Sequence, residues 1–207
     1  MEQKKEQFFG RGNPAMPLEV VKAKGSYIYG ADGKKYIDFL GGAGVGSLGW
    51  GVPEIEDAIR KNDRPSYVYP NFHYKPWNRV AEMLAEMTPG KLKKSFRMTG
   101  GSEAVESALE MATMYTGRKK ILSVEGAYHG NTIAAISIGA STKHKKFPNL
   151  LAGTQKIQPP LTKNSLEKIE DLLSSKEFAA VIMEPVIINL GVIIPEKEFM
   201  EGLDRLC

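Results

Sequence analysis

Three short segments of the sequence carry residue types that could bind or position a ligand. The first is Thr99-Gly100-Gly101-Ser102, between an expected strand and an expected helix. Glycines permit a tight turn and close approach of a ligand to the backbone, and the first-turn amides of a helix favour an anion. The segment is therefore a candidate phosphate site. It also fits a capping box in which Ser102 caps the helix and Glu103 and Glu106 occupy its first turn. The four residues alone leave both interpretations open.

The other two segments follow strands. In Glu125-Gly126-Ala127-Tyr128-His129-Gly130, an aromatic ring between glycines follows an expected sheet strand. There Tyr128 could lie flat against a planar ligand, or it could be a buried aromatic residue of a loop. Glu184 follows the apolar run 181–183, where α/β sheets place ligand-binding groups. The alternative is that Pro185 simply ends the strand and leaves Glu184 in solvent.

Other kinds of site are not indicated. The three histidines share no metal-ligand spacing, and Cys207, the single cysteine, excludes a multi-cysteine zinc site and a disulfide framework. There is no Gly-x-Ser-x-Gly nucleophile motif. We therefore expect no metal site.

Composition and charge narrow the class of protein. The 207 residues carry a net charge of +4, from 28 basic and 24 acidic residues, and the small lysine clusters at 91–94 and 143–146 lack interleaved aromatics. We expect no nucleic-acid partner. No apolar run approaches the roughly 20 residues of a membrane span, and the opening residues 1–5 do not resemble a signal peptide. We expect a cytoplasmic protein.

The first sixty residues differ from the rest. Two strands, 27–29 and 36–39, flank an Asp-Gly turn and predict a small hairpin. Six glycines in the eleven residues from Gly41 to Gly51 indicate unusual backbone or a nearby ligand. Pro53 then begins a short helix.

Strands and helices alternate in the remainder. Helices are expected from Pro76, over 102–116 with periodic apolar residues and Gly117 at its end, from a cap at Ser165, and from Pro195. Residues 132–138 fit a helix or an apolar turn. Strands are expected over 95–98, 121–124, 155–157 and 179–183. Alternation of this kind predicts an α/β fold with a mainly parallel sheet covered by helices on both faces.

In this order, the segments resemble one family. The stretch 25–39, the run Leu48-Gly49-Trp50-Gly51-Val52-Pro53, the segment 99–108, Thr116-Gly117-Arg118, Tyr128-His129-Gly130 and Glu184-Pro185-Val186 are similar to the ordered motifs of class III, fold-type I pyridoxal-phosphate (PLP) aminotransferases. The resemblance covers nearly the whole chain. It implies an N-terminal segment over 1–60, part of the small domain, and the first part of the PLP-binding large domain over 61–207.

The resemblance also implies roles for individual residues. Gly101 and Ser102, with Gly100, would hold the cofactor phosphate, Tyr128 would stack on the pyridine ring, and Glu184 would lie in the cofactor pocket. Residues 69–72 and 41–46 would lie near the substrate entrance. Small-molecule amines or amino acids and keto acids are the implied substrates, and a homodimer is the implied assembly.

The sequence departs from the family pattern in several places. The family more often has histidine at Trp50, and its glutamine and glycine after Glu-Pro-Val are here Ile187 and Ile188. Asn189 stands where ornithine- and aminobutyrate-type members have an acidic residue. The Asp-Glu-Val strand, the Schiff-base lysine and the distal arginine of the family have no counterpart here. We expect them beyond Cys207, so that these residues alone supply no catalytic group and no turnover.

The resemblance therefore implies an enzyme that moves an amino group from an amine or amino acid to a keto acid. Two alternatives remain. A glutamate-1-semialdehyde-type aminomutase or an amino-acid epimerase shares the same motifs. A non-catalytic fragment that binds a phosphorylated ligand would keep the anion site without the reaction.

Overall fold

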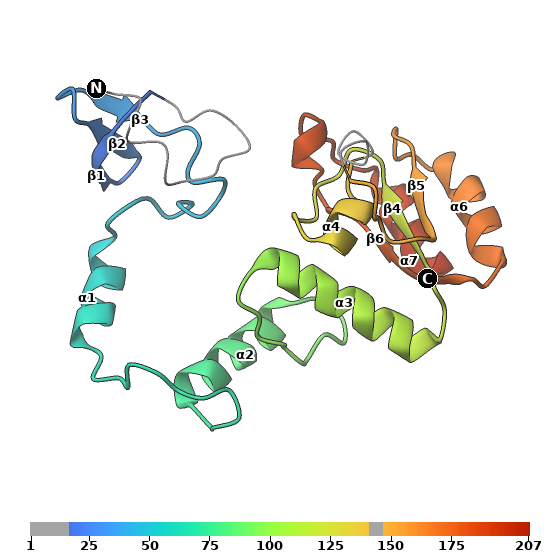
Figure 1. Ribbon diagram of the computed structural model, residues 1–207, viewed down its shortest axis with the longest axis horizontal. Helices are drawn as coiled ribbons and strands as arrows, with labels where there is room; N and C mark the ends of the chain where they lie inside the picture. Colours follow the sequence, from blue (N-terminus) through green and yellow to red (C-terminus); the bar gives the residue numbers. More distant parts are fainter. Residues whose placement is uncertain (1–16, 141–146) are drawn as a thin grey trace. The chain divides into compact units, whose positions relative to one another are not determined.

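Two sheets organise the protein, and they belong to different parts of the chain. The computed structural model describes residues 17–140 and 147–207 (Figure 1). The described residues divide into two compact units, one ending at Tyr74 and the other comprising the residues from Lys75 to Cys207. The opening residues 1–5 and the lysine cluster at 143–146 lie outside the described residues.

The N-terminal unit contains an antiparallel sheet of three strands in the order β1-β2-β3, namely Val20–Lys24, Tyr27–Gly30 and Lys35–Ile37. The expected hairpin is confirmed: Tyr27 pairs with Ile37 across β2 and β3. Its turn is closed by Asp32, whose carboxylate accepts hydrogen bonds from the Lys34 amide at 3.0 Å and the Tyr36 hydroxyl at 2.6 Å. Strand β1 was not predicted, because its sequence shows no clear alternation of apolar and polar residues. In the structure its residues are mostly exposed.

The glycine-dense loop that follows is closed by Asp38 and Trp50. Five of its six glycines have positive φ, as the sequence predicts: Gly41, Gly42, Gly44, Gly49 and Gly51. The Asp38 carboxylate accepts a hydrogen bond from the Trp50 indole at 2.7 Å and from the backbone amide of Gly41 at 2.9 Å. A Cβ at Gly46 would lie 2.8 Å from the Trp50 ring, so the indole occupies the space that a side chain there would need. Helix α1, Pro53–Lys61, begins at Pro53 as expected.

The second unit is built on a parallel sheet in the order β5-β4-β6, namely Thr154–Ile157, Lys120–Val124 and Phe178–Ile182. In register, Ile121 faces Thr154 on one side and Ala180 on the other. Because β4 is central and buried on both faces, three of its five residues are apolar, namely Ile121, Leu122 and Val124. The expected α/β fold with a parallel sheet is confirmed.

Helices cover both faces of this sheet. Helices α3 (Gly101–Thr116) and α4 (Ile133–Ile138) bury Leu109 and Ile138 against Ile121 on one face. Helices α6 (Ser165–Ser174) and α7 (Lys197–Leu206) bury Ile169 and Phe199 on the other face, against a larger cluster that includes Leu122, Val124 and Ile157. Figure 1 shows α6 and α7 beside the sheet in orange and red. Two further helical elements are α2 (Lys75–Met87) and the 3₁₀ turn η2 (Ile188–Leu190).

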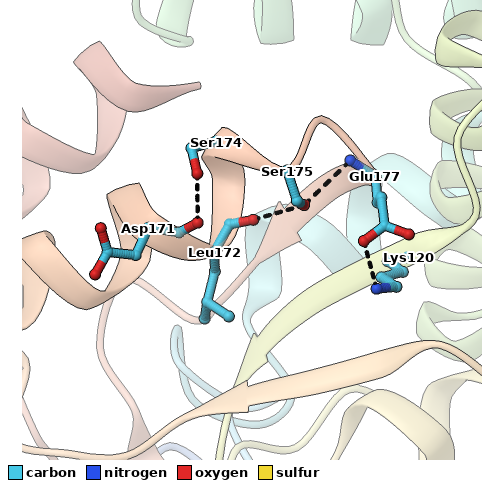
Figure 2. Close-up of polar contacts among 6 residues, drawn as sticks. All are labelled: Lys120, Asp171, Leu172, Ser174, Ser175 and Glu177. Carbon is cyan, nitrogen blue, oxygen red and sulfur yellow. Dashed lines mark hydrogen bonds and ion pairs between the residues drawn. The ribbon is translucent and has the colours of Figure 1, made fainter.

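The connection from α6 to β6 is fixed by local hydrogen bonds (Figure 2). The Ser175 hydroxyl donates to the Leu172 carbonyl at 2.8 Å and accepts the Glu177 amide at 3.4 Å. Glu177 then forms a 2.6 Å ion pair with Lys120. This pair joins the first residue of β4 to the residue directly before β6, so it links the two strands at the amino end of the sheet.

Three local expectations differ from the structure. Residues 95–98 do not form a strand, because no neighbouring strand pairs with them among the described residues. Ser165 is the first residue of α6 and its hydroxyl donates to the Pro160 carbonyl at 2.7 Å, so Asn164 occupies the cap position. The last helix begins at Lys197 rather than Pro195, after an extended Glu196. Among the described residues no helix is long and apolar enough to cross a membrane.

Substitution Phe199→Ala tests the core beneath β4. Phe199 is fully buried, so we expect its truncation to lower the free energy of unfolding by about 3–5 kcal/mol. Urea denaturation of the intact protein measures the change. Tyr115→Ala removes a ring that is 93% exposed and serves as the control, with an expected loss below about 0.5 kcal/mol. Equal losses in the two variants would contradict the assigned core.

Candidate functional site

The candidate site lies at the carboxyl ends of two neighbouring strands, β4 and β6. After β4 the chain runs to α4 on one face of the sheet, and after β6 it runs to α7 on the opposite face. Parallel sheets bind ligands where adjacent strands send their connections to opposite faces, because a crevice opens there. The sequence places Tyr128 after β4 and Glu184 after β6, so the topology brings these two residues to the same edge of the sheet.

Tyr128 and Glu184 are in direct contact. The backbone amide of Tyr128 donates a hydrogen bond to Glu184 Oε1 at 2.9 Å, across 56 positions of sequence. Glu184 is partly buried and bonded, which argues against a merely solvated carboxylate at the end of a strand. Tyr128 is 43% exposed, so it is not the buried aromatic of the alternative interpretation. The contact holds the loop after β4 against the end of β6.

The loop that carries Tyr128 is also joined to the start of α3. The Asn131 side chain donates to the Tyr128 hydroxyl at 2.9 Å, and the Asn131 amide donates to Ser102 Oγ at 3.1 Å. Gly130 has a φ of 129°, and a Cβ there would lie 2.3 Å from Ser102 Oγ. Glycine at position 130 is therefore required for the loop to approach Ser102. In this way the structure brings Ser102, Tyr128 and Glu184 together.

Gly100 and Gly101 leave open space at the N-terminus of α3. Gly100 is the cap residue in extended backbone (φ −166°), and Gly101 is the first helical residue. A Cβ at either position would meet nothing within 4 Å, and neither residue has a positive φ. No contact in the described residues thus requires glycine there. The first-turn amides lack intrahelical partners, so the space beside them suits an anion.

The capping-box alternative does not describe this helix. Ser102 is the second residue of α3, not its cap, and no side chain caps the helix. Glu103 instead reaches back to accept the amide and the hydroxyl of Thr99, and the Thr99 hydroxyl lowers the pKa of its carboxyl. Glu106 accepts the amide of Ala134 at 3.2 Å. The acidic residues of the first turns are therefore bonded to other donors.

His129, the residue that follows Tyr128 in this loop, is 8% exposed. Its Nε2 atom, with the hydroxyls of Ser123 and Thr132, is buried without a hydrogen-bond partner among the described residues. Burial lowers the pKa of His129, the charge of Glu184 opposes this shift, and Lys156 adds to it. Burial thus disfavours the protonated imidazole in the folded protein. Buried polar atoms of this kind are normally satisfied by water, by a ligand or by further chain.

The residues present fit a phosphorylated planar ligand. The open amides at Gly100 and Gly101 suit a phosphate, and the exposed face of Tyr128 suits a flat ring. Within residues 17–140 and 147–207, no group of three or more histidine, cysteine, aspartate or glutamate side chains could hold a metal ion.

A sequence profile of the class-III aminotransferases matches residues 8–207. The chain belongs to this family. It is 34% identical over 200 residues to the glutamate-1-semialdehyde 2,1-aminomutase of Symbiobacterium thermophilum, covering 92% of this chain and 45% of that protein. It is 32% identical over 187 residues to the LysW-aminoadipate semialdehyde/glutamate semialdehyde transaminase of Sulfolobus acidocaldarius, covering 90% of this chain and 47% of that protein. The chain thus spans about half the length of the curated relatives it matches.

Solved structures of class-III aminotransferases share the fold. The taurine:2-oxoglutarate aminotransferase of Bifidobacterium kashiwanohense, in complex with PLP and glutamate, matches with a TM-score of 0.86 and 29% identity over 97% of this chain and 50% of that one. The adenosylmethionine-8-amino-7-oxononanoate aminotransferase of Methanocaldococcus jannaschii matches with a TM-score of 0.87 and 27% identity over 98% and 50%. The fold-type I assignment is confirmed.

The sequence did not point to Asn131, nor to the contacts that Glu106 and Lys156 make near the candidate site. Asn131 directly follows the Tyr-His-Gly motif, so a polar residue next to the motif was an available signal. Glu106 was considered only as a helix-capping residue. Lys156 lies in β5, and its contacts depend on the pairing of strands that no local pattern specifies.

Substitution His129→Gln tests whether His129 stays neutral in the folded protein. Because burial lowers its pKa, the unfolded state binds a proton below about pH 6.5 that the folded state excludes. The contribution of His129 to the free energy of unfolding is therefore fully present above this pH and is lost as the pH falls. In the variant, we expect the slope of the unfolding free energy against pH to fall by the equivalent of up to about one bound proton. Urea denaturation between about pH 7.5 and 5.5 measures this slope. The exposed His73 provides the matched control, His73→Gln; an unchanged pH slope in His129→Gln would contradict the neutral assignment.

Proposed function

We propose that this chain is the cofactor-binding part of a PLP-dependent enzyme that transfers an amino group from an amine or amino acid to a keto acid. The observation that carries the proposal is that hydrogen bonds join three elements at one edge of the sheet: the N-terminus of α3, the Tyr128 loop after β4, and Glu184 after β6. Family membership and the match to an aminotransferase bound to PLP support it.

Each of these three elements would contact a different part of PLP. The amides at Gly100, Gly101 and Ser102 would donate to the phosphate, whose two negative charges the positive end of the α3 dipole favours. The Tyr128 ring would lie against the pyridine ring. Glu184 would lie in the same pocket, with its Oε1 atom already engaged by the Tyr128 amide.

PLP, when bound, supplies an electron sink that stabilises negative charge next to the nitrogen of the substrate. The residues of this chain position that group. The Asn131 side chain donates to the Tyr128 hydroxyl, and Glu184 accepts the Tyr128 backbone amide. Tyr128 is therefore held both at the tip of its ring and at its backbone.

A glutamate-1-semialdehyde-type aminomutase is the second candidate. The 34% identity to such an enzyme from Symbiobacterium thermophilum favours it. Two assays of the full-length enzyme, with the Schiff-base lysine of the family present, separate the two: with PLP, an amino donor and 2-oxoglutarate a transferase makes glutamate, whereas an aminomutase rearranges glutamate-1-semialdehyde without an acceptor. Release of neither product would contradict both.

We also propose that the protein is a cytoplasmic homodimer. Several apolar side chains of the glycine-dense loop are strongly exposed: Phe39 at 93%, Leu40 at 63%, Val45 at 83% and Leu48 at 78%. Burial of this surface against a second copy would remove it from water. The single cysteine agrees with a reducing compartment. Analytical ultracentrifugation of the intact protein tests the dimer.

Two substitutions at Gly101 separate binding from folding. Because a Cβ there meets nothing, we expect both Gly101→Ala and Gly101→Asp to fold, and Asp in the first turn favours the helix. Gly101→Asp places a negative charge where phosphate would approach, and loss of one charge-assisted hydrogen bond costs about 1.5–3 kcal/mol, or about tenfold to hundredfold in affinity. Equilibrium dialysis with PLP measures the affinity. Unchanged retention of PLP by a folded Gly101→Asp protein would refute the phosphate site.

Substitutions at Tyr128 test stacking. Tyr128→Phe keeps the ring and should keep most of the affinity for PLP, while Tyr128→Ala should lose about 0.5–1.5 kcal/mol, or about twofold to tenfold, and shift the cofactor absorbance. Because Tyr128 is 43% exposed, the melting temperature of the PLP-free protein should change little. A large fall in that temperature, with an unaltered cofactor spectrum, would instead indicate a core tyrosine.

A further inference from the structure

Helix α4 is too short to be stable through its own hydrogen bonds. It has six residues, and isolated helices shorter than about 12–15 residues are marginal in water. Nevertheless its last four residues, 135–138, are buried. The helix must therefore be held by other elements, and charged side chains from two of them reach its ends.

Glu106 holds the N-terminus of α4. The cap residue Thr132 makes no side-chain cap hydrogen bond. In its place Glu106 Oε1, from α3, accepts the Ala134 amide at 3.2 Å. A carboxylate at this end satisfies a free amide and interacts favourably with the helix dipole.

Lys156 holds the C-terminus of α4. Its Nζ atom, from β5, donates to the Ser137 carbonyl at 3.1 Å and to the Gly139 carbonyl. Lys156 is partly buried, and burial lowers the pKa of its ammonium group, with the charge of Glu125 opposing that shift. An ammonium group is the complementary charge for this end of a helix. Because it is engaged with backbone carbonyls, Lys156 is not a free amine nucleophile.

Residues on both sides of α4 bind the loop that carries Tyr128. Before the helix, Asn131 donates to the Tyr128 hydroxyl at 2.9 Å. After the helix, the Ala140 amide donates to the carbonyl of Ala127 at 3.0 Å. Displacement of α4 at either end would therefore move a residue that contacts Tyr128 or its neighbour.

We propose that Glu106 and Lys156 are positioning residues that clamp α4 by opposite charges at its two ends and thereby fix the Tyr128 ring for the cofactor. The cofactor part of this inference rests on the proposed function. The clamp itself is a property of the protein without any ligand, so the two parts can be tested separately.

Hydrogen exchange of the intact, PLP-free protein tests the clamp. Lys156→Met keeps the length of the side chain but removes the donor, so the amides of residues 127–140 should exchange about tenfold faster, the change that a partly buried charge at a helix end can produce. Lys156→Arg should restore their protection. Lys168→Met, on the exposed side of α6, is the matched control and should leave them unchanged. Unchanged protection of 127–140 in Lys156→Met, or failure of Lys156→Arg to restore it, would overturn the clamp.

The opposite end provides a second variant should Lys156→Met fail to fold. Glu106→Gln keeps an oxygen acceptor and removes only the charge, so we expect a smaller acceleration of the same amides, and Glu110→Gln on the same helix serves as control.

Circular dichroism of added PLP then tests the link to Tyr128. The band of bound PLP should weaken in Lys156→Met and return in Lys156→Arg. A band unchanged in Lys156→Met would overturn the link. Failure of every protein, wild type included, to bind PLP would overturn the proposed function while leaving the clamp to the exchange data.

Discussion

The parallel pairing of β4 with β6 is the constraint on which the candidate site depends. Their register sets Ser123 opposite Ile182, so the segments that follow the two strands leave the sheet side by side and turn to opposite faces. The carboxyl ends of the strands are thereby left open between the departing loops. The Tyr128 amide and the Glu184 carboxylate meet in that opening, and their hydrogen bond joins the two loops. At the amino end, the Lys120–Glu177 ion pair joins the same two strands.

A site made from loop ends needs support, because loops contribute few buried contacts of their own. Here the support comes from backbone groups bonded to side chains of neighbouring elements. Ser102 from α3, Glu106 from α3 and Lys156 from β5 each accept from or donate to the backbone between residues 131 and 139. The loop is therefore fixed by α3 on one side and by the sheet on the other, and both are anchored in buried apolar clusters.

Local patterns in the sequence were sufficient for most of the helices and strands and for part of the site. Helix α3 was predicted from its periodic apolar residues and Gly117, which the structure places in left-handed backbone at its end. Tyr128 and Glu184 were each placed after a strand, but their contact spans 56 residues and depends on strand order, which no local pattern contains. Lys156 was missed for the same reason. Residues 95–98 have strand-like composition, yet a strand also requires a partner, and none pairs with them among the described residues.

The first turns of α3 place acidic residues next to the proposed anion site, and the structure resolves this conflict. Acidic residues near a helix N-terminus stabilise the helix, but their charge would repel a phosphate at the same amides. Glu103 is turned back to Thr99, and Glu106 is turned to the N-terminus of α4. Each carboxylate thus faces donors of its own, while the amides beside Gly100 and Gly101 adjoin open space. The glycines and the redirected carboxylates together leave the positive end of the helix accessible, so an anion can bind there without displacing either glutamate.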